Sequence, residues 1–319
     1  MSSATTGAHP LAGVALIVLM GLAFAGLDTG VRWLGATMPV LLMLTWRYAT
    51  QAVAMAAWLG VLAWRERART AGHRPRFRPG HPRFQILRGA LLLATSLLSF
   101  FGLQFMPVAE FTAINMLTPV IGTLLAAWLL HERVTPGRWA LVALAFTGAL
   151  VVIRPGSGLF GWAVVFPLAC ALTYASFQVL TRRLAGLDDP LTTHFWTGLV
   201  GTALLLPVLV ASGIDVGGSL AAAGAREWAV LVAIGLLGTG GHLLLILAFR
   251  LGPASTLMPF VYTQIGSATL LGWLVFGALP DAFGWLGMAV IAAAGAATAW
   301  LNWRGSAGAA GKPARAGSR

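Results

Sequence analysis

Three ionisable side chains, Asp28, Arg32 and Arg47, fall inside long apolar stretches of this sequence. A charged group near the centre of a bilayer costs at least about 2.5–3.5 kcal/mol, so each needs a physical reason. At about 1.5 Å per residue, Asp28 and Arg47 lie about 7 Å and about 6 Å from the middle of their stretches, toward the same side. They can therefore pair between helices and hold an anionic group of a solute, or a proton. The alternative is a local pair of Asp28 with Arg32, four residues along one helix.

Neutral polar side chains near the middle of other apolar stretches are weaker candidates. They are Gln51, Asn115, Tyr174, Gln178, His242, Tyr262, Thr263 and Gln264. Hydrogen bonds between helices explain most such residues in membrane bundles, and contact with a solute is the alternative for each. Pro259 precedes Tyr262 and Gln264 and predicts a break in the helix that exposes backbone carbonyls near a cavity. His242 is expected to be neutral and hydrogen-bonded, and the aromatic residues Trp46, Phe101 and Trp196 either stack on a planar solute or pack at the interface.

The sequence offers little for metal, redox or nucleotide chemistry. Its one cysteine, Cys170, cannot form an internal disulfide, and no Cys/His cluster has the spacing of metal ligands. His131-Glu132 lacks the second histidine one turn later that a zinc motif of this kind needs, and no G-x-x-x-x-G-K-[ST] loop occurs. We therefore expect no catalytic residue, metal or cofactor, and no direct use of ATP.

The composition identifies lipid as the solvent for most of the chain. Of 319 residues, 58% are hydrophobic and 9% are charged, against about 25% charged in ordinary soluble domains. A net charge of +12 would suggest nucleic acid in a soluble protein, but here the basic residues lie between apolar runs. The bilayer, and not nucleic acid, is therefore the expected partner of the surface, and a homodimer is neither required nor excluded.

Apolar runs of the length of a membrane span, about 20 residues, occur ten times. They cover residues 12–35, 38–64, 86–106, 108–130, 138–154, 159–181, 191–211, 227–249, 254–276 and 283–303. If the even-numbered connections and the C-terminal tail share one side, 17 of the 21 basic residues lie there, and only Arg154 and Arg226 lie on the other. This asymmetry predicts ten crossings of the inner membrane with both termini in the cytoplasm.

The chain also contains a weak internal repeat. A shift of 146 residues aligns 106–139 with 252–285 without gaps and matches Pro107 with Pro253 and Trp139 with Trp285. The shift maps the fourth and fifth spans onto the ninth and tenth, so each half has five spans and the halves have opposite topology, as in many transporters. We expect an all-α integral membrane protein with a cytoplasmic N-terminus (1–11), two inverted repeats (12–154 and 159–303) and a disordered basic cytoplasmic tail (304–319).

Three segments carry a resemblance to a known family: Met106-Pro107-Val108-Ala109-Glu110, Leu130-His131-Glu132-Arg133-Val134 and Phe276-Gly277-Ala278-Leu279-Pro280. With the ten-span layout, they resemble the EamA branch of the drug/metabolite transporter superfamily. Asp28 with Arg32, Thr181-Arg182-Arg183-Leu184 and Tyr262-Thr263-Gln264 look most similar to its members assigned to riboflavin or S-adenosylmethionine uptake. One departure is Ala278, which stands where the second repeat usually has a glutamate matching Glu132.

The resemblance and the repeats together imply a secondary transporter that moves a small organic metabolite by alternating access, with import favoured over export by the resemblance alone. Coupling to protons, exchange and simple facilitation all stay open. The alternatives are a metabolite or amino-acid exporter of the same fold, an integral membrane enzyme acting on a lipid-linked substrate, a lipid flippase and a structural membrane subunit. An enzyme of that kind usually gathers its reactive groups at one membrane face, whereas here they are spread through the depth of the bilayer.

Overall fold

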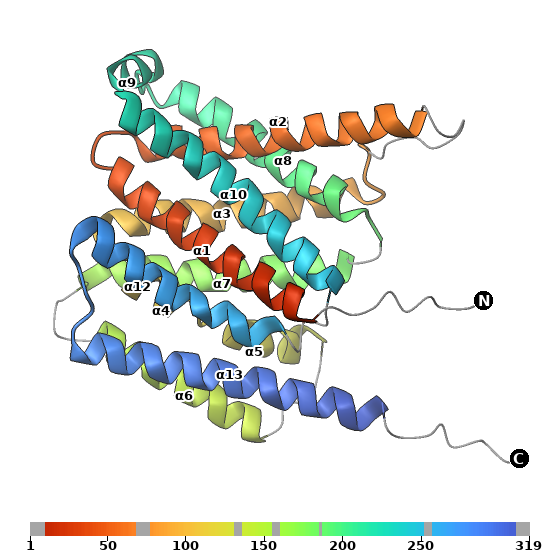
Figure 1. The fold of residues 1–319 in the computed structure, drawn as a ribbon, viewed down its shortest axis with the longest axis vertical. Coiled ribbons are helices and arrows are strands. Elements are labelled where there is room, and N and C mark those ends of the chain that lie inside the picture. The colour runs from red at the N-terminus through yellow and green to blue at the C-terminus, as the bar shows by residue number, and fades with distance from the viewer. Residues whose placement is uncertain are drawn as a thin grey trace, which may run out of the picture.

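The computed structural model describes residues 10–67, 77–130, 136–154, 160–184, 187–251 and 257–310, which form helices and no strand. The helices are α1 (Pro10–Leu34), α2 (Val40–Arg67), α3 (Pro82–Phe105), α4 (Val108–Asn115), α5 (Thr118–Leu130), α6 (Pro136–Ile153), α7 (Val165–Leu184), α8 (Pro190–Ala211), α9 (Val216–Ala222), α10 (Ala225–Leu251), α12 (Thr263–Phe276) and α13 (Ala282–Ala310). Short 3-10 helices, η1 (Gly161–Val164) and η2 (Met258–Tyr262), precede α7 and α12. The long helices lie side by side in one bundle, and α1 begins at the same end at which α13 finishes (Figure 1). We call this the terminal end.

Several helices have the length and composition of membrane spans. Five suffice by these criteria: Leu11–Leu34, Pro82–Phe105, Gly161–Thr181, Pro190–Ala211 and Ala225–Ala248. Shorter apolar helices cover Val108–Gly122, Trp139–Ile153, Phe260–Phe276 and Ala282–Thr298. Large apolar side chains such as Val53, Trp58 and Leu274 are exposed on the outside of the bundle, as expected where lipid is the solvent. The chain is therefore an all-helical membrane protein, while the count of ten crossings and the side of each terminus stay predictions.

The structure differs from the predicted spans at three places. The expected fourth span, 108–130, is interrupted at Met116 and Leu117, which separate α4 from α5. A short helix, α9, occupies the connection before α10, which none of the predicted spans covers. The prediction of disorder from residue 304 is wrong for the segment up to Ala310, because α13 continues through it, and residues 311–319 lie outside the described part of the chain.

The contacts between helices form matching pairs when the two halves of the chain, α1–α6 and α7–α13, are interchanged. The contact of α1 with α10 has a counterpart in that of α7 with α3, and the contact of α1 with α12 in that of α7 with α4 and α5. The contact of α3 with α8 is likewise matched by that of α10 with α2. The two remaining large contacts, α2 with α8 and α6 with α13, join equivalent helices of the two halves. A pair of structural repeats related by a two-fold axis would produce this pattern.

Glycines allow α2 to approach α8 and α10 closely. A Cβ atom on Gly201 would lie 2.2 Å from the ring of Tyr48, and one on Gly198 would lie 2.7 Å from the backbone nitrogen of Ala52. On α10, a Cβ on Gly238 would lie 2.7 Å from Nε of Arg47. Small residues at such contacts are typical of helices packed in lipid. They bring the side chain of Arg47 directly against the backbone of α10.

Candidate functional site

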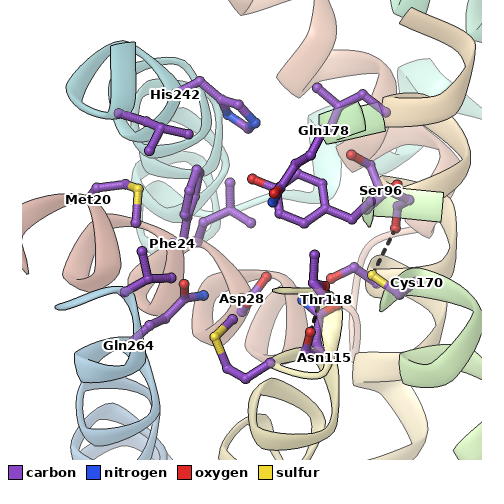
Figure 2. A pocket seen from close by; sticks show the side chains of 18 of the residues that line it. Met20, Phe24, Asp28, Ser96, Asn115, Thr118, Cys170, Gln178, His242 and Gln264 are labelled. Carbon is purple, nitrogen blue, oxygen red and sulfur yellow. Dashed lines mark hydrogen bonds between the residues drawn. The ribbon is translucent and has the colours of Figure 1, made fainter. Parts of the chain in front are cut away.

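A cavity of about 120 Å³ lies in the middle of the bundle, among α1, α2, α3, α4, α5, α7, α10 and α12. Most of its lining is apolar, and a small set of polar groups is placed within it, which is the usual character of a small-molecule site. In Figure 2, Met20, Phe24 and His242 form one wall, and Ser96, Cys170 and Gln178 form the opposite wall. Asp28, Asn115, Thr118 and Gln264 lie together below them in this view.

Seven of the ten site residues predicted from the sequence line this cavity. They are Asp28, Arg47, Asn115, Tyr174, Gln178, His242 and Gln264. They come from six helices, and both halves of the chain contribute. The structure therefore brings together residues up to 236 positions apart in the sequence, from Asp28 to Gln264. Their contact with a solute stays a prediction.

Two interruptions of helical structure meet the cavity, one in each half. Asn115 ends α4, and the Thr118 hydroxyl that begins α5 donates to the Asn115 carbonyl at 2.7 Å. In the second half, Pro259 lies in the 3-10 helix η2, and Gln264 follows in the first turn of α12. The irregular backbone expected at Pro259 is thus present. In a membrane protein such backbone is tolerated where it lines a cavity, which both interruptions do.

Asp28 and Arg47 both reach the cavity but do not form a direct ion pair. Within the described ranges the only ion pair with charged atoms inside 4.0 Å is Arg154 with Asp281, at 2.6 Å. Asp28 instead lies beside Ser99 and close enough to Arg47 for their charges to interact. Arg47 is 3% exposed, and its Nη1 donates to Ser96 Oγ at 3.0 Å.

His242 is held by its own helix. Its Nδ1 lies 3.0 Å from the Gly238 carbonyl, and because a carbonyl only accepts, this nitrogen carries the hydrogen. Nε2 is then the acceptor, and it is buried without a partner. The ring packs edge-on against Phe24 with centroids 4.9 Å apart, and lies 5.9 Å from the ring of His194. A hydrogen-bonded histidine is what the sequence analysis favours, and one of its nitrogens still has acceptor capacity to offer.

Three predicted site residues, Arg32, Gln51 and Tyr262, do not line the cavity. Arg32 donates to the carbonyls of Leu103 and Met106 at the C-terminus of α3, where a cation is favourable, and not to Asp28. The local Asp28–Arg32 pair is therefore not formed. Gln51 is fully buried, and its amide nitrogen donates to the His194 carbonyl at 2.9 Å. The Tyr262 ring packs so closely on Gly295 of α13 that a Cβ there would lie 1.8 Å from it.

The other singled-out residues serve as packing or turn elements. Trp46 packs edge-on against Trp228, Trp196 Nε1 donates to the Phe77 carbonyl at 2.8 Å, and Phe101 is exposed. The Thr263 hydroxyl donates to the Phe260 carbonyl at 2.6 Å. Asp189 caps α8 before Pro190, and Asp281 accepts from the backbone nitrogen of Gly284 in the first turn of α13, so both carboxylates cap helices. Residues 131–135 lie outside the described part of the chain, as do the side chains of Arg182 and Arg183.

A second buried polar cluster, on α3, α7 and α8, was not predicted from the sequence. Arg88 was counted among the 17 basic residues of the connections and the tail, although it falls within the predicted span 86–106. In the structure it is 6% exposed, its Nε donates to Thr181 Oγ1 at 2.8 Å, and its Nη1 donates to Thr197 Oγ1 at 2.6 Å. Its guanidinium lies 4.5 Å from the centre of the Phe177 ring. Its position inside an apolar run was the signal that could have identified it.

At the terminal end, Asp188 forms hydrogen bonds to the connection between α2 and α3 and to the first turn of α3. It accepts from the Gly80 backbone nitrogen at 2.6 Å and from Gln85 Nε2 at 2.8 Å. Partial burial raises the pKa of Asp188, but the hydrogen bonds from Gln85 and Gly80 outweigh it and leave the pKa below its ordinary value of 3.8. A lowered folded-state pKa means that the stabilisation is present above this ordinary value and disappears as the pH falls through the folded-state pKa.

We therefore expect Asp188→Asn to lower the thermal unfolding midpoint at pH 7 and to have no effect at a pH below the folded-state pKa of the wild-type carboxylate. Midpoints of both proteins in the same detergent, measured from pH 7 down to about pH 3, check this pH dependence. A difference in midpoint that stayed constant across this range would contradict it.

A helical bundle in lipid, with a central cavity that both halves of the chain line and that contains several polar groups, is the arrangement typical of solute transporters. The sequence matches the EamA-like transporter family over residues 11–154 and 161–299, and the chain belongs to that family. It is a multi-pass protein of the inner membrane.

Relatives with names are consistent with this membership. A riboflavin transporter of Rhizobium johnstonii is 29% identical over 296 residues, 92% of each chain. An S-adenosylmethionine uptake transporter of Rickettsia prowazekii is 23% identical over 63% of this chain and 66% of its own. A solved crystal structure superposes with a TM-score of 0.61 over 92% of this chain and 97% of the other, at 22% identity, and shares the fold.

Proposed function

We propose that this protein is a secondary transporter that carries a small organic metabolite across the inner membrane by alternating access, in the direction of uptake. A flavin such as riboflavin is the first solute to test, and S-adenosylmethionine is the second. The observation that carries the proposal is the central cavity of about 120 Å³, which a carboxylate and a guanidinium both line without forming an ion pair among the described residues. Charged groups at this depth are costly unless a function retains them.

The inverted arrangement of two five-helix units belongs to the same proposal. It is supported by the exchange symmetry of the helix contacts and by the two interruptions, one in each half, that meet at the cavity. A site at the junction of two such units can open to either side when one unit rocks against the other. Reporter fusions at both termini and in each connection test the ten crossings, and termini on different sides would contradict them.

The relatives' names support the solute class. The riboflavin transporter matches this chain over nearly its whole length, whereas the S-adenosylmethionine transporter matches about two thirds of it. The aromatic cavity residues Phe24, Phe100 and Tyr174 suit a planar ring system. None of the named relatives reported above is an enzyme, which favours transport over chemistry on a lipid-linked substrate.

Counterflow in proteoliposomes tests the proposal directly. Vesicles containing the purified protein are loaded with unlabelled riboflavin, S-adenosylmethionine, an amino acid or a nucleoside, and the entry of the same labelled solute is followed. We expect transient accumulation of riboflavin above that in protein-free vesicles. Counterflow of S-adenosylmethionine alone would replace the first solute by the second, and a lack of counterflow with every metabolite would contradict transport of this class.

A further inference from the structure

Two serines on α3 lie in the cavity lining together with its two charged groups. Ser96 accepts from Arg47 at 3.0 Å, and Ser99 lies beside Asp28. Tyr48 Oη lies 3.0 Å from the same Ser96 hydroxyl and fixes it further. Three residues along a helix correspond to about 4.5 Å of rise, almost one turn. Helix α3 therefore places one hydroxyl beside the guanidinium of α2 and another beside the carboxylate of α1, and among the described residues these two charged groups form no ion pair within 4.0 Å.

The separated charges require a solute that supplies both kinds of hydrogen bond. A carboxylate only accepts and a guanidinium only donates, so the group between them must place a donor next to an acceptor. Such bonds to charged groups are the strongest that a neutral solute can form. Arg47 has one further buried nitrogen, Nε, without a partner.

The charge around the cavity argues against a cationic solute. Arg88 is buried in the same interior, and its guanidinium lies 4.5 Å from the centre of the Phe177 ring, which stacks on the ring of Tyr174 in the cavity lining. Asp28 is the one acidic residue in the cavity lining, against the buried cations Arg47 and Arg88. A solute with a permanent positive charge would meet this excess in a medium of low dielectric constant, whereas a neutral or anionic solute would not.

We infer that the cavity recognises a planar, neutral or anionic heterocycle through an imide edge, in which an N–H donates to Asp28 and an adjacent carbonyl accepts from Arg47. The inference deepens the proposed function and rests on it, since the isoalloxazine ring of a flavin carries such an edge at N3. The aromatic side chains of the cavity supply a stacking surface for the ring, and the hydrogen bonds at the imide edge fix the orientation of the ring.

A methyl group at the edge tests the inference. Binding of riboflavin and of 3-methylriboflavin, in which the N3 hydrogen is replaced, is measured with the purified wild-type protein and with Asp28→Ala and Asp28→Asn. We expect methylation to weaken binding to the wild type at least tenfold, because a hydrogen bond to a charged group is worth about 1.5–3 kcal/mol. In Asp28→Ala the difference between the two flavins should fall below about threefold, and Asp28→Asn, which keeps an acceptor, should lie between.

The same measurements separate failure of the inference from failure of the proposed function. If both flavins bind equally well to the wild type, the imide edge is wrong and flavin transport still stands. If riboflavin does not bind but lumazine, a smaller imide heterocycle, binds in an Asp28-dependent way, the flavin assignment is wrong and the inference holds. Binding of S-adenosylmethionine or a zwitterionic amino acid, with no imide heterocycle bound, overturns the inference and the flavin assignment, and leaves transport of a small organic metabolite standing. Unchanged unfolding midpoints of the variants show that they are folded.

Discussion

Replacing Arg47 by methionine is expected to reduce the rate of saturable solute uptake about 100-fold while the protein stays folded. The guanidinium is the cationic group of the cavity lining, and methionine fills much of the same volume without a donor. Two charge-assisted hydrogen bonds to a solute carbonyl, each worth about 1.5–3 kcal/mol, correspond to at least two factors of ten. The measurement is initial uptake into proteoliposomes, normalised to the amount of inserted protein.

Two further variants make this result specific. Arg65→Gln removes a positive charge from an exposed position on the same helix, and uptake should stay within about twofold of the wild type. Arg47→Lys keeps the charge but loses the planar fork of donors, so an intermediate loss is expected. Wild-type uptake by Arg47→Met would show that the guanidinium is a packing element, held by Ser96 and passing over Gly238.

Much of the cavity lining could be predicted from the sequence because few ionisable or polar residues occur at the depth of the bilayer, and those that do stand out. Asp28 and Arg47 stand out since ionised groups inside an apolar run are rare and costly, and both reach the cavity. Depth along a helix follows from counting residues, but the direction of a side chain around it depends on which neighbours surround the helix. Arg32 shows this limit, since it donates to carbonyls at the C-terminus of α3, whose position beside α1 could not be predicted from the sequence.

The residues that were missed are those whose role depends on a partner far away in the chain. Ser96 and Ser99 are ordinary small polar residues in sequence, and only the fold sets them against Arg47 and Asp28. Gln51, which was predicted as a site residue, instead donates to the carbonyl of His194, 143 positions away. The interruption after Asn115 was also missed, although Thr118-Pro119 signals a helix start, because proline is favoured in the first turn of a helix and disfavoured in its interior.

Because both halves of the chain line the cavity, binding of a solute there is coupled to any movement of one half against the other. Asp28, Arg47, Ser96 and Asn115 come from the first half, whereas Tyr174, Gln178, His242 and Gln264 come from the second. Any rotation of one half against the other changes the distance between these two groups of side chains. A solute that touches both groups therefore favours the arrangement in which they are close, which is how binding biases a conformational equilibrium.

Replacing Arg88 by alanine is expected to lower the free energy of unfolding by about 3 kcal/mol, the range of a large-to-small change in a packed interior. The side chain fills the space among α3, α7 and α8, donates to two threonine hydroxyls and covers the ring of Phe177. Alanine would leave a hole beside that ring and remove all of these contacts. The measurement is the thermal and denaturant-induced unfolding of the purified variant in detergent.

The Arg88 variants also separate volume from charge. Arg88→Met keeps most of the volume and removes a buried cation that has no carboxylate within 4.0 Å among the described residues, so its stability should stay within about 1 kcal/mol of the wild type. Arg83→Ala, at an exposed position of the same helix, is the matched control and should leave stability unchanged. If Arg88→Met lost as much stability as Arg88→Ala, hydrogen bonding and charge, and not packing, would be what Arg88 contributes. If neither lost stability, the cation would be retained for the electrostatic field of the cavity alone.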